Sequence, residues 1–269
     1  MQKNPEYNYH SQCEKVKITN LSFADDLLLF ARGDFIYVDL MMKTFHSFSA
    51  ATGLKMNASN CKIYFGSMDE NTKQEIKLLT GFPEGPLPFR YLGVPITTMK
   101  MNCHHYTGLV KKIVGRITHW RARILSYAGK IQLLKSITFA VTNYWMQCFP
   151  LPKHVIHKID AICRSFMWTG GKEISRKSPI SWDKVCRPKC NGGMNLISLQ
   201  IWNQATLSKL LWSISCKADS LWVRWVHAYY LKKDKIMDVK IRISCSWILK
   251  AILKQRDNVN NMQVWHMMR

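Results

Sequence analysis

The stretch that decides the fold is Leu21-Ser-Phe-Ala-Asp-Asp-Leu-Leu-Leu-Phe30, in which two adjacent carboxylates, Asp25 and Asp26, separate two short apolar runs. Short apolar runs bounded by turn-forming residues are typical of buried strands. Asp favours tight turns, because its carboxylate bonds local backbone groups and because it tolerates unusual dihedral angles. We therefore predict a β-hairpin that pairs residues 18–23 with residues 27–32 and carries both carboxylates at its tip.

Two carboxylates on such a hairpin have two interpretations. They offer the hard oxygen ligands that a Mg²⁺ site for phosphoryl chemistry requires. They are also compatible with a solvated turn that happens to contain two Asp residues, because short motifs often occur by chance. The local sequence favours the solvated turn, so the surrounding segments have to decide.

The segment Phe23-Ala-Asp-Asp26 resembles the metal-binding hairpin of reverse transcriptases, and the form of the rest resembles plant non-LTR (LINE-type) retrotransposon polymerases. Four further segments occur in the order of that family, and the resemblance runs from about Ile18 to about Asp257. The family's segment after the hairpin is similar to Thr52-Gly-Leu-Lys-Met-Asn57 with Lys62, and its primer grip is similar to Phe89-Arg-Tyr-Leu-Gly-Val-Pro95. Its thumb is similar to Leu125-Ser-Tyr-Ala-Gly-Lys-Ile-Gln-Leu-Leu134, and the segment beyond the thumb is similar to Pro188-Lys-Cys-Asn-Gly-Gly-Met-Asn-Leu196.

This resemblance implies roles for individual residues. It implies that Asp25 and Asp26 are catalytic ligands of Mg²⁺ and that Lys62 protonates the leaving pyrophosphate, although a surface lysine beside a strand is an equally good interpretation of Lys62. It also implies that an RNA or DNA template–primer duplex is the partner. The residues expected to contact that duplex are Arg90, Tyr91, Leu92, Gly93, Lys111, Lys112, Arg116, Arg121 and Arg123.

The resemblance further implies an incomplete catalytic site. In that family the fingers, a palm strand with another catalytic aspartate and a template-gripping helix precede the hairpin, whereas 24 residues precede Asp25 here. Two-metal catalysis needs ligands that clamp two ions ~4 Å apart, which two adjacent Asp residues do not readily supply. We therefore expect a fragment of an RNA-directed DNA polymerase that is inactive without the missing N-terminal half, so its status as an enzyme stays open.

Two alternatives remain, namely a non-catalytic basic module that binds nucleic acid and a decayed transposon relic. The chain has 39 Lys+Arg against 17 Asp+Glu, a net charge of +22, which favours nucleic acid or an anionic membrane surface as partner. The longest apolar stretch, residues 131–151, is not a membrane span, because polar residues and a proline interrupt it. Nucleic acid is the better expectation.

The cysteines and the N-terminal residues bear on the compartment. The nine cysteines are odd in number and show no framework spacing, and residues 1–17 contain no hydrophobic signal segment. Both features favour an intracellular protein with free thiols, in the nucleus or the cytoplasm.

A zinc site is a weak alternative for some of these thiols. Cys186 and Cys190 are spaced C-x₃-C, but no second such pair or properly spaced His pair follows them. The neighbours His104 and His105 are expected to point in different directions on a regular element and are poor joint ligands.

The whole pattern predicts an α+β fold dominated by helices, with an incomplete palm followed by a helical thumb and a connection region. The palm consists of the hairpin, a helix that Asp34 caps and that ends at Gly53, and a strand over residues 61–65; residues 66–108 are loop-rich. We divide the chain into an unsupported leader (1–17), a partial palm with the primer-grip-like segment (18–100), a thumb-like helical region (101–169) and a helical connection region (170–269).

Overall fold

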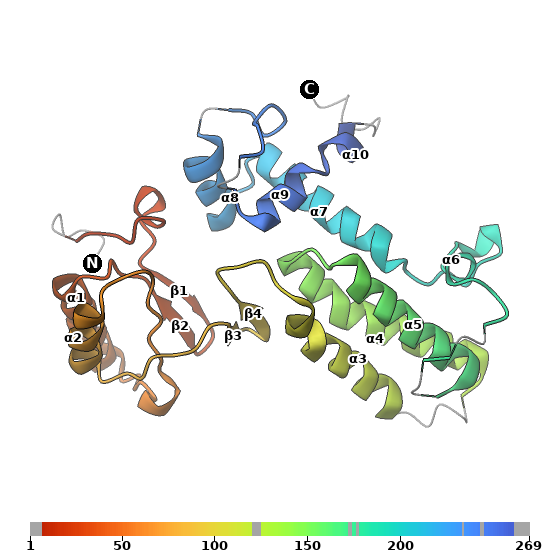
Figure 1. Cartoon of the computed structure of the whole chain (residues 1–269), viewed down its shortest axis with the longest axis horizontal. Helices are drawn as coiled ribbons and strands as arrows, with labels where there is room; N and C mark the ends of the chain where they lie inside the picture. Colours follow the sequence, from red (N-terminus) through yellow and green to blue (C-terminus); the bar gives the residue numbers. More distant parts are fainter. Residues whose placement is uncertain are drawn as a thin grey trace. The chain divides into compact units, whose positions relative to one another are not determined.

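The computed structural model describes residues 7–119, 125–171, 174–175, 178–232, 234–242 and 245–260. The fold is α+β and dominated by helices, with two two-stranded antiparallel sheets in this described part (Figure 1). The predicted fold class is therefore confirmed. The chain divides into two compact units, the first comprising residues 1–98 and 217–233 and the second comprising residues 99–216 and 234–269.

The predicted hairpin lies in the first unit. Strand β1 (Asn20–Phe23) pairs antiparallel with strand β2 (Asp26–Leu29), and the register places Phe23 opposite Asp26. Ala24 and Asp25 form the turn between the strands, and Ala24 has a positive φ of 50°, as the tight turns of hairpins commonly require. The hairpin is confirmed, with strands shorter than predicted.

Apolar side chains of this hairpin are exposed, because two strands alone cannot bury both of their faces. Phe23 is 61% exposed and Leu27 is 41% exposed, whereas Leu29 is half-buried.

Helix α1 (Phe35–Thr52) follows the hairpin and ends at Gly53, whose φ of 73° is the left-handed conformation that favours glycine. Asp34 occupies the predicted N-cap position, but its carboxylate makes no capping hydrogen bond. It lies instead 3.1 Å from Nε of Arg32 in an exposed ion pair. The predicted helix is confirmed, and the capping role of Asp34 is wrong because Arg32 competes for its carboxylate.

A second helix, α2 (Glu70–Thr80), lies within the stretch that the sequence predicts to be loop-rich, which corrects that prediction. The carboxylate of Asp69 caps its start by accepting a hydrogen bond from the backbone N–H of Thr72 at 2.9 Å, and Gly81 ends it with a φ of 69°. The buried Ile76 packs against α1. Prolines and glycines are frequent in the residues after α2. The sequence of this region therefore resembles a loop, and the caps of α2 are easily overlooked.

The strand predicted over residues 61–65 is also wrong. It is reduced to a single bridge between Ile63 and Glu84, in which the N–H of Gly85 donates to the carbonyl of Ile63 at 2.9 Å. A short 3-10 turn, η2 (Ala58–Asn60), precedes the bridge. Further along, β3 (Phe89–Tyr91) and β4 (Val94–Ile96) form the second hairpin.

A segment from late in the chain completes the first unit. Helix α8 (Leu221–Val226) and the π-helical turn η5 (His227–Leu231) contact the 3-10 turn η1 (Glu14–Val16). The hydroxyl of Tyr229 donates to the carbonyl of Ser11 at 3.1 Å and accepts from the N–H of Lys15 at 2.9 Å. Residues 7–17 thus have partners, which differs from the unsupported leader that the sequence predicts.

The second unit is helical in its described part. Helices α3, α4 and α5 lie side by side and contact one another (Figure 1), and α7 packs against α4, α5, α9 and α10. Its helical elements are η3 (Cys103–Tyr106), α3 (Thr107–His119), α4 (Tyr127–Cys148), α5 (Lys153–Thr169), α6 (Trp182–Val185), η4 (Lys189–Asn191), α7 (Leu199–Ser215), α9 (Trp247–Leu253) and α10 (Arg256–Asn260).

A side-chain amide fixes the chain where α4 gives way to α5. Asn203 on α7 accepts a hydrogen bond from the N–H of Leu151 at 3.0 Å and donates one to the carbonyl of Leu151 at 3.0 Å. Leu151 is buried, so its backbone groups depend on this partner. The amide therefore ties α7 to the turn between two other helices.

Candidate functional site

Asp25 and Asp26 lie at the tip of the β1–β2 hairpin. Asp25 belongs to the turn and Asp26 opens β2, and both residues are exposed. Within the described residues neither carboxylate forms an ion pair. The hairpin thus presents two carboxylates to solvent, as the sequence predicts.

The Mg²⁺ that the resemblance implies needs more ligands than this hairpin supplies. Mg²⁺ is commonly held by one or two carboxylates together with substrate phosphates, but the two-ion mechanism clamps both the attacking and the leaving oxygens. In the described part of the chain, no three His, Cys, Asp or Glu side chains gather where they could hold a metal ion. Asp25 and Asp26 therefore do not by themselves fit a two-ion site.

Lys62 lies beside the Ile63 bridge, and its side chain is exposed. The hydrogen bonds and ion pairs of the described residues do not connect Lys62 to Asp25 or Asp26. Its role as a general acid stays a prediction.

The primer-grip-like residues form the second hairpin of the first unit. Leu92 and Gly93 connect β3 to β4 with positive φ values of 50° and 80°, which is the pattern of a type I′ turn. Arg90 lies on β3 opposite Pro95 and is exposed, whereas Tyr91 is half-buried. The four predicted contact residues are thus adjacent on one hairpin, with the guanidinium of Arg90 at the surface.

Helix α3 of the second unit has one apolar face and one basic face. The apolar face is buried, with at most 2% of each residue exposed, and consists of Leu109, Ile113 and Ile117. The basic face, defined by Lys111, Lys112 and Arg116, is exposed. No carboxylate of the described residues forms an ion pair with these three cations. The predicted contact residues Arg121 and Arg123, and the neighbouring Trp120, lie outside the described residues.

One exposed cysteine and one histidine lie close together in the fold, a contact that the sequence does not reveal. Sγ of Cys103, the first residue of η3, lies 2.9 Å from Nε2 of His154 on α5. The two residues are far apart in the sequence, so no local spacing signals their contact. Cys186 and Cys190 have free thiols, and they belong to no metal-binding group among the residues described here.

The prediction that His104 and His105 point apart is wrong. Their ring centroids are 4.0 Å apart, with the planes tilted by 34°. The ring of His105 is turned back toward the start of η3, because its Nδ1 accepts a hydrogen bond from the N–H of Asn102 at 2.9 Å. This local bond brings the two rings together, although neighbouring residues on a regular element point in different directions.

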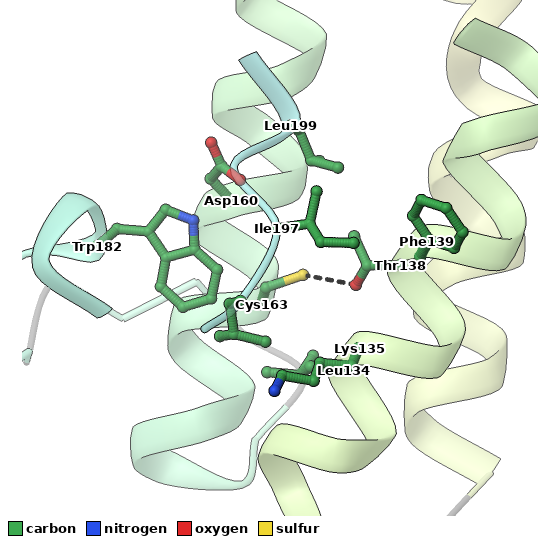
Figure 2. A pocket seen from close by; sticks show the side chains of 10 residues that line it. Leu134, Lys135, Thr138, Phe139, Asp160, Cys163, Trp182, Ile197 and Leu199 are labelled. Atoms are coloured by element: carbon green, nitrogen blue, oxygen red, sulfur yellow. Dashed lines mark hydrogen bonds between the residues drawn. The ribbon is translucent and has the colours of Figure 1, made fainter. Parts of the chain in front are cut away.

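A small pocket of the second unit surrounds a buried thiol and a partly buried carboxylate (Figure 2). Cys163 and Asp160 enter it from α5, and the hydroxyl of Thr138 on α4 lies 3.6 Å from Sγ of Cys163. The cavity of about 20 Å³ is the size of a single water. The pocket is therefore too small for a cofactor or substrate.

The pocket shifts the pKa values of its carboxylate and of its thiol. Burial raises the pKa of Asp160 to about 6, although a hydrogen bond from Trp182 and the nearby charges of His157 and Arg164 act in the opposite direction, while Asp183 adds to the rise. Burial likewise raises the pKa of the Cys163 thiol to about 12. Burial thus favours the neutral form of both groups.

Comparisons with known proteins connect the chain to plant sequences. No protein-family model matches it. Over 129 residues, or 48% of the chain, it is 27% identical to a protein of Arabidopsis thaliana named "Putative ribonuclease H protein", and the match covers 21% of that protein. Over 119 residues, or 44% of the chain, it is 26% identical to an "Uncharacterized mitochondrial protein" of the same plant, with 77% of that protein covered.

The chain thus spans about a fifth of the first relative and about three quarters of the second. None of the described helices combines the length and the apolar character needed to cross a membrane.

Proposed function

We propose that this chain is a retroelement-derived plant sequence, specifically a segment of a non-LTR reverse transcriptase, whose own activity is to bind duplex nucleic acid with little sequence preference. The two plant relatives support the retroelement origin, and the ordered motifs support the reverse transcriptase. The binding role rests on a single observation, the exposed cations Lys111, Lys112 and Arg116 beside the buried apolar face of α3, with which no carboxylate of the described residues forms an ion pair.

The physical argument for binding is counterion release. A cation that neutralises a phosphate frees the counterions condensed on the nucleic acid, so affinity falls steeply as salt rises. Lys111, Lys112 and Arg116 suit this task because no carboxylate among the described residues neutralises them. The excess of positive charge over the whole chain, +22, strengthens the attraction at long range.

The experiment is a salt titration of duplex binding by the full chain. The three cations of the basic face, replaced together by Ala, should flatten the log–log salt slope by roughly two to three units, since each phosphate contact on B-form DNA contributes about −0.9. The fold should be intact by circular dichroism, because these side chains are exposed.

A matched control removes three positive charges elsewhere. Lys43, Lys73 and Lys77 each form an ion pair with a carboxylate, so their replacement by Ala changes the net charge equally but should leave the slope nearly unchanged. Equal slopes for the two triple variants, or salt-independent binding, would show that α3 is not the interface.

A second assay separates binding from chemistry. Because Asp25 and Asp26 alone do not supply a two-ion site, the isolated chain should extend no primer on an RNA template with Mg²⁺ and all four nucleotides. Extension that disappears in an Asp25→Ala variant would mean that other carboxylates complete the site.

A further inference from the structure

Cys103 and His154 combine a nucleophile and a base at the surface of the second unit. Sγ of Cys103 and Nε2 of His154 are 2.9 Å apart, within hydrogen-bonding distance, and both residues are exposed. One residue comes from η3 and the other from the first turn of α5. The contact is therefore made by tertiary packing of two helical elements and is accessible to small molecules.

Both members of the pair lie at the start of a helical element. Cys103 is the first residue of a helical run that continues directly from η3 into α3, and His154 is the second residue of α5. The imidazole of His105 holds the start of η3 through its bond to the N–H of Asn102, so Cys103 sits on an ordered turn.

Two other exposed thiols of the chain provide an internal comparison. Cys190 and Cys216 are free and exposed like Cys103. Within the residues that the structure describes, neither of them lies within hydrogen-bonding distance of an imidazole. Of these three exposed thiols, Cys103 alone has an imidazole neighbour among the described residues.

We propose that His154 makes Cys103 the preferred site of thiol–disulfide exchange with small aliphatic disulfides. The thiolate is the attacking species in this exchange. Nε2 of His154 takes the proton from Sγ, and the thiolate then attacks one sulfur of the disulfide. A new S–S bond forms to Sγ while the original S–S bond breaks, and the departing thiolate receives the proton from the imidazolium.

The test uses the full chain and glutathione disulfide as the probe, with mass spectrometry of the three cysteine-containing peptides. Cys103 should acquire the mixed disulfide roughly tenfold faster than Cys190 and Cys216, less than the 10²–10⁴ of a general base in an enclosed active site because the pair is exposed. A His154→Gln variant keeps a polar side chain that cannot take the proton. In that variant the rate at Cys103 should fall to about that of Cys190, while the rates at Cys190 and Cys216 stay unchanged.

Two further measurements make the result decisive. Circular dichroism of His154→Gln checks that the exposed substitution leaves the helices intact, and a Cys103→Ser variant should lose the fast adduct. Equal rates at the three thiols of the unaltered chain, or an unchanged rate at Cys103 in His154→Gln, would overturn the proposal. None of these measurements involves nucleic acid, so the outcome is independent of the proposed function.

Discussion

Loss of the Asn203 side-chain amide should lower the free energy of unfolding of the second unit. An Asn203→Ala change leaves both the N–H and the carbonyl of the buried Leu151 without a partner, which costs about 1–3 kcal/mol for each unsatisfied group. We expect a lower midpoint of urea unfolding, with the slope unchanged. The neighbouring exposed Gln204 is the control, since Gln204→Ala should change stability by less than about 0.5 kcal/mol.

For single residues, the sequence predicts backbone conformation better than it predicts side-chain contacts. The left-handed Gly53 and the exposed Asp25 and Asp26 follow from local preferences of single residues. Asp34 shows the limit, because the choice between a cap and an ion pair with Arg32 depends on side-chain competition. The Cys103–His154 pair could not be predicted, since it depends on how two separate elements pack.

At the scale of the elements, Asp160 near the junction of α5 and α6 should make the free energy of unfolding depend on pH. The pKa of Asp160 is about 6 in the fold against an ordinary value of 3.8, so the folded state binds a proton more readily than the unfolded state. The free energy of unfolding should therefore fall as pH rises from about 4 to about 6 and then level off for this group. The loss is on the order of 2–3 kcal/mol, at 1.4 kcal/mol per unit.

The measurement is urea unfolding of the chain and of an Asp160→Asn variant at pH 4 and pH 7. The variant is nearly isosteric and cannot ionise, so it should gain stability relative to the parent as pH rises. A difference between the two proteins that does not change with pH would contradict the expected ionisation of Asp160.

Helices were easier to predict from sequence than strands. The predicted helix after the hairpin is present and ends at Gly53 as predicted, because a glycine after an apolar helical segment marks a helix C-terminus. Helix α2 was missed although Asp69 caps it, and the strand over residues 61–65 became one bridge. Strand length depends on which partner strand is available, and a single short segment does not contain that information.

At the scale of the whole molecule, the hydrogen bonds that join residues 217–233 to residues 7–17 within the first unit can be tested. A Tyr229→Phe change removes the hydrogen bonds to the backbone of Ser11 and Lys15, each worth about 0.5–1.5 kcal/mol. We expect faster amide hydrogen exchange in residues 7–17, while α3 to α5 keep their protection. A Trp222→Phe change on the exposed side of α8 is the control, and equal effects of the two variants would contradict a specific role for Tyr229.

The return of residues 217–233 to the first unit has a consequence for synthesis. A nascent chain emerges from the ribosome in order, so the first 98 residues appear before the segment that completes their unit. At about 5–20 residues per second, the intervening residues 99–216 take roughly 6–24 seconds to translate. During that time residues 11–15 lack their hydrogen-bond partners Trp225 and Tyr229, and a chaperone that shields this segment would raise the yield of folded protein.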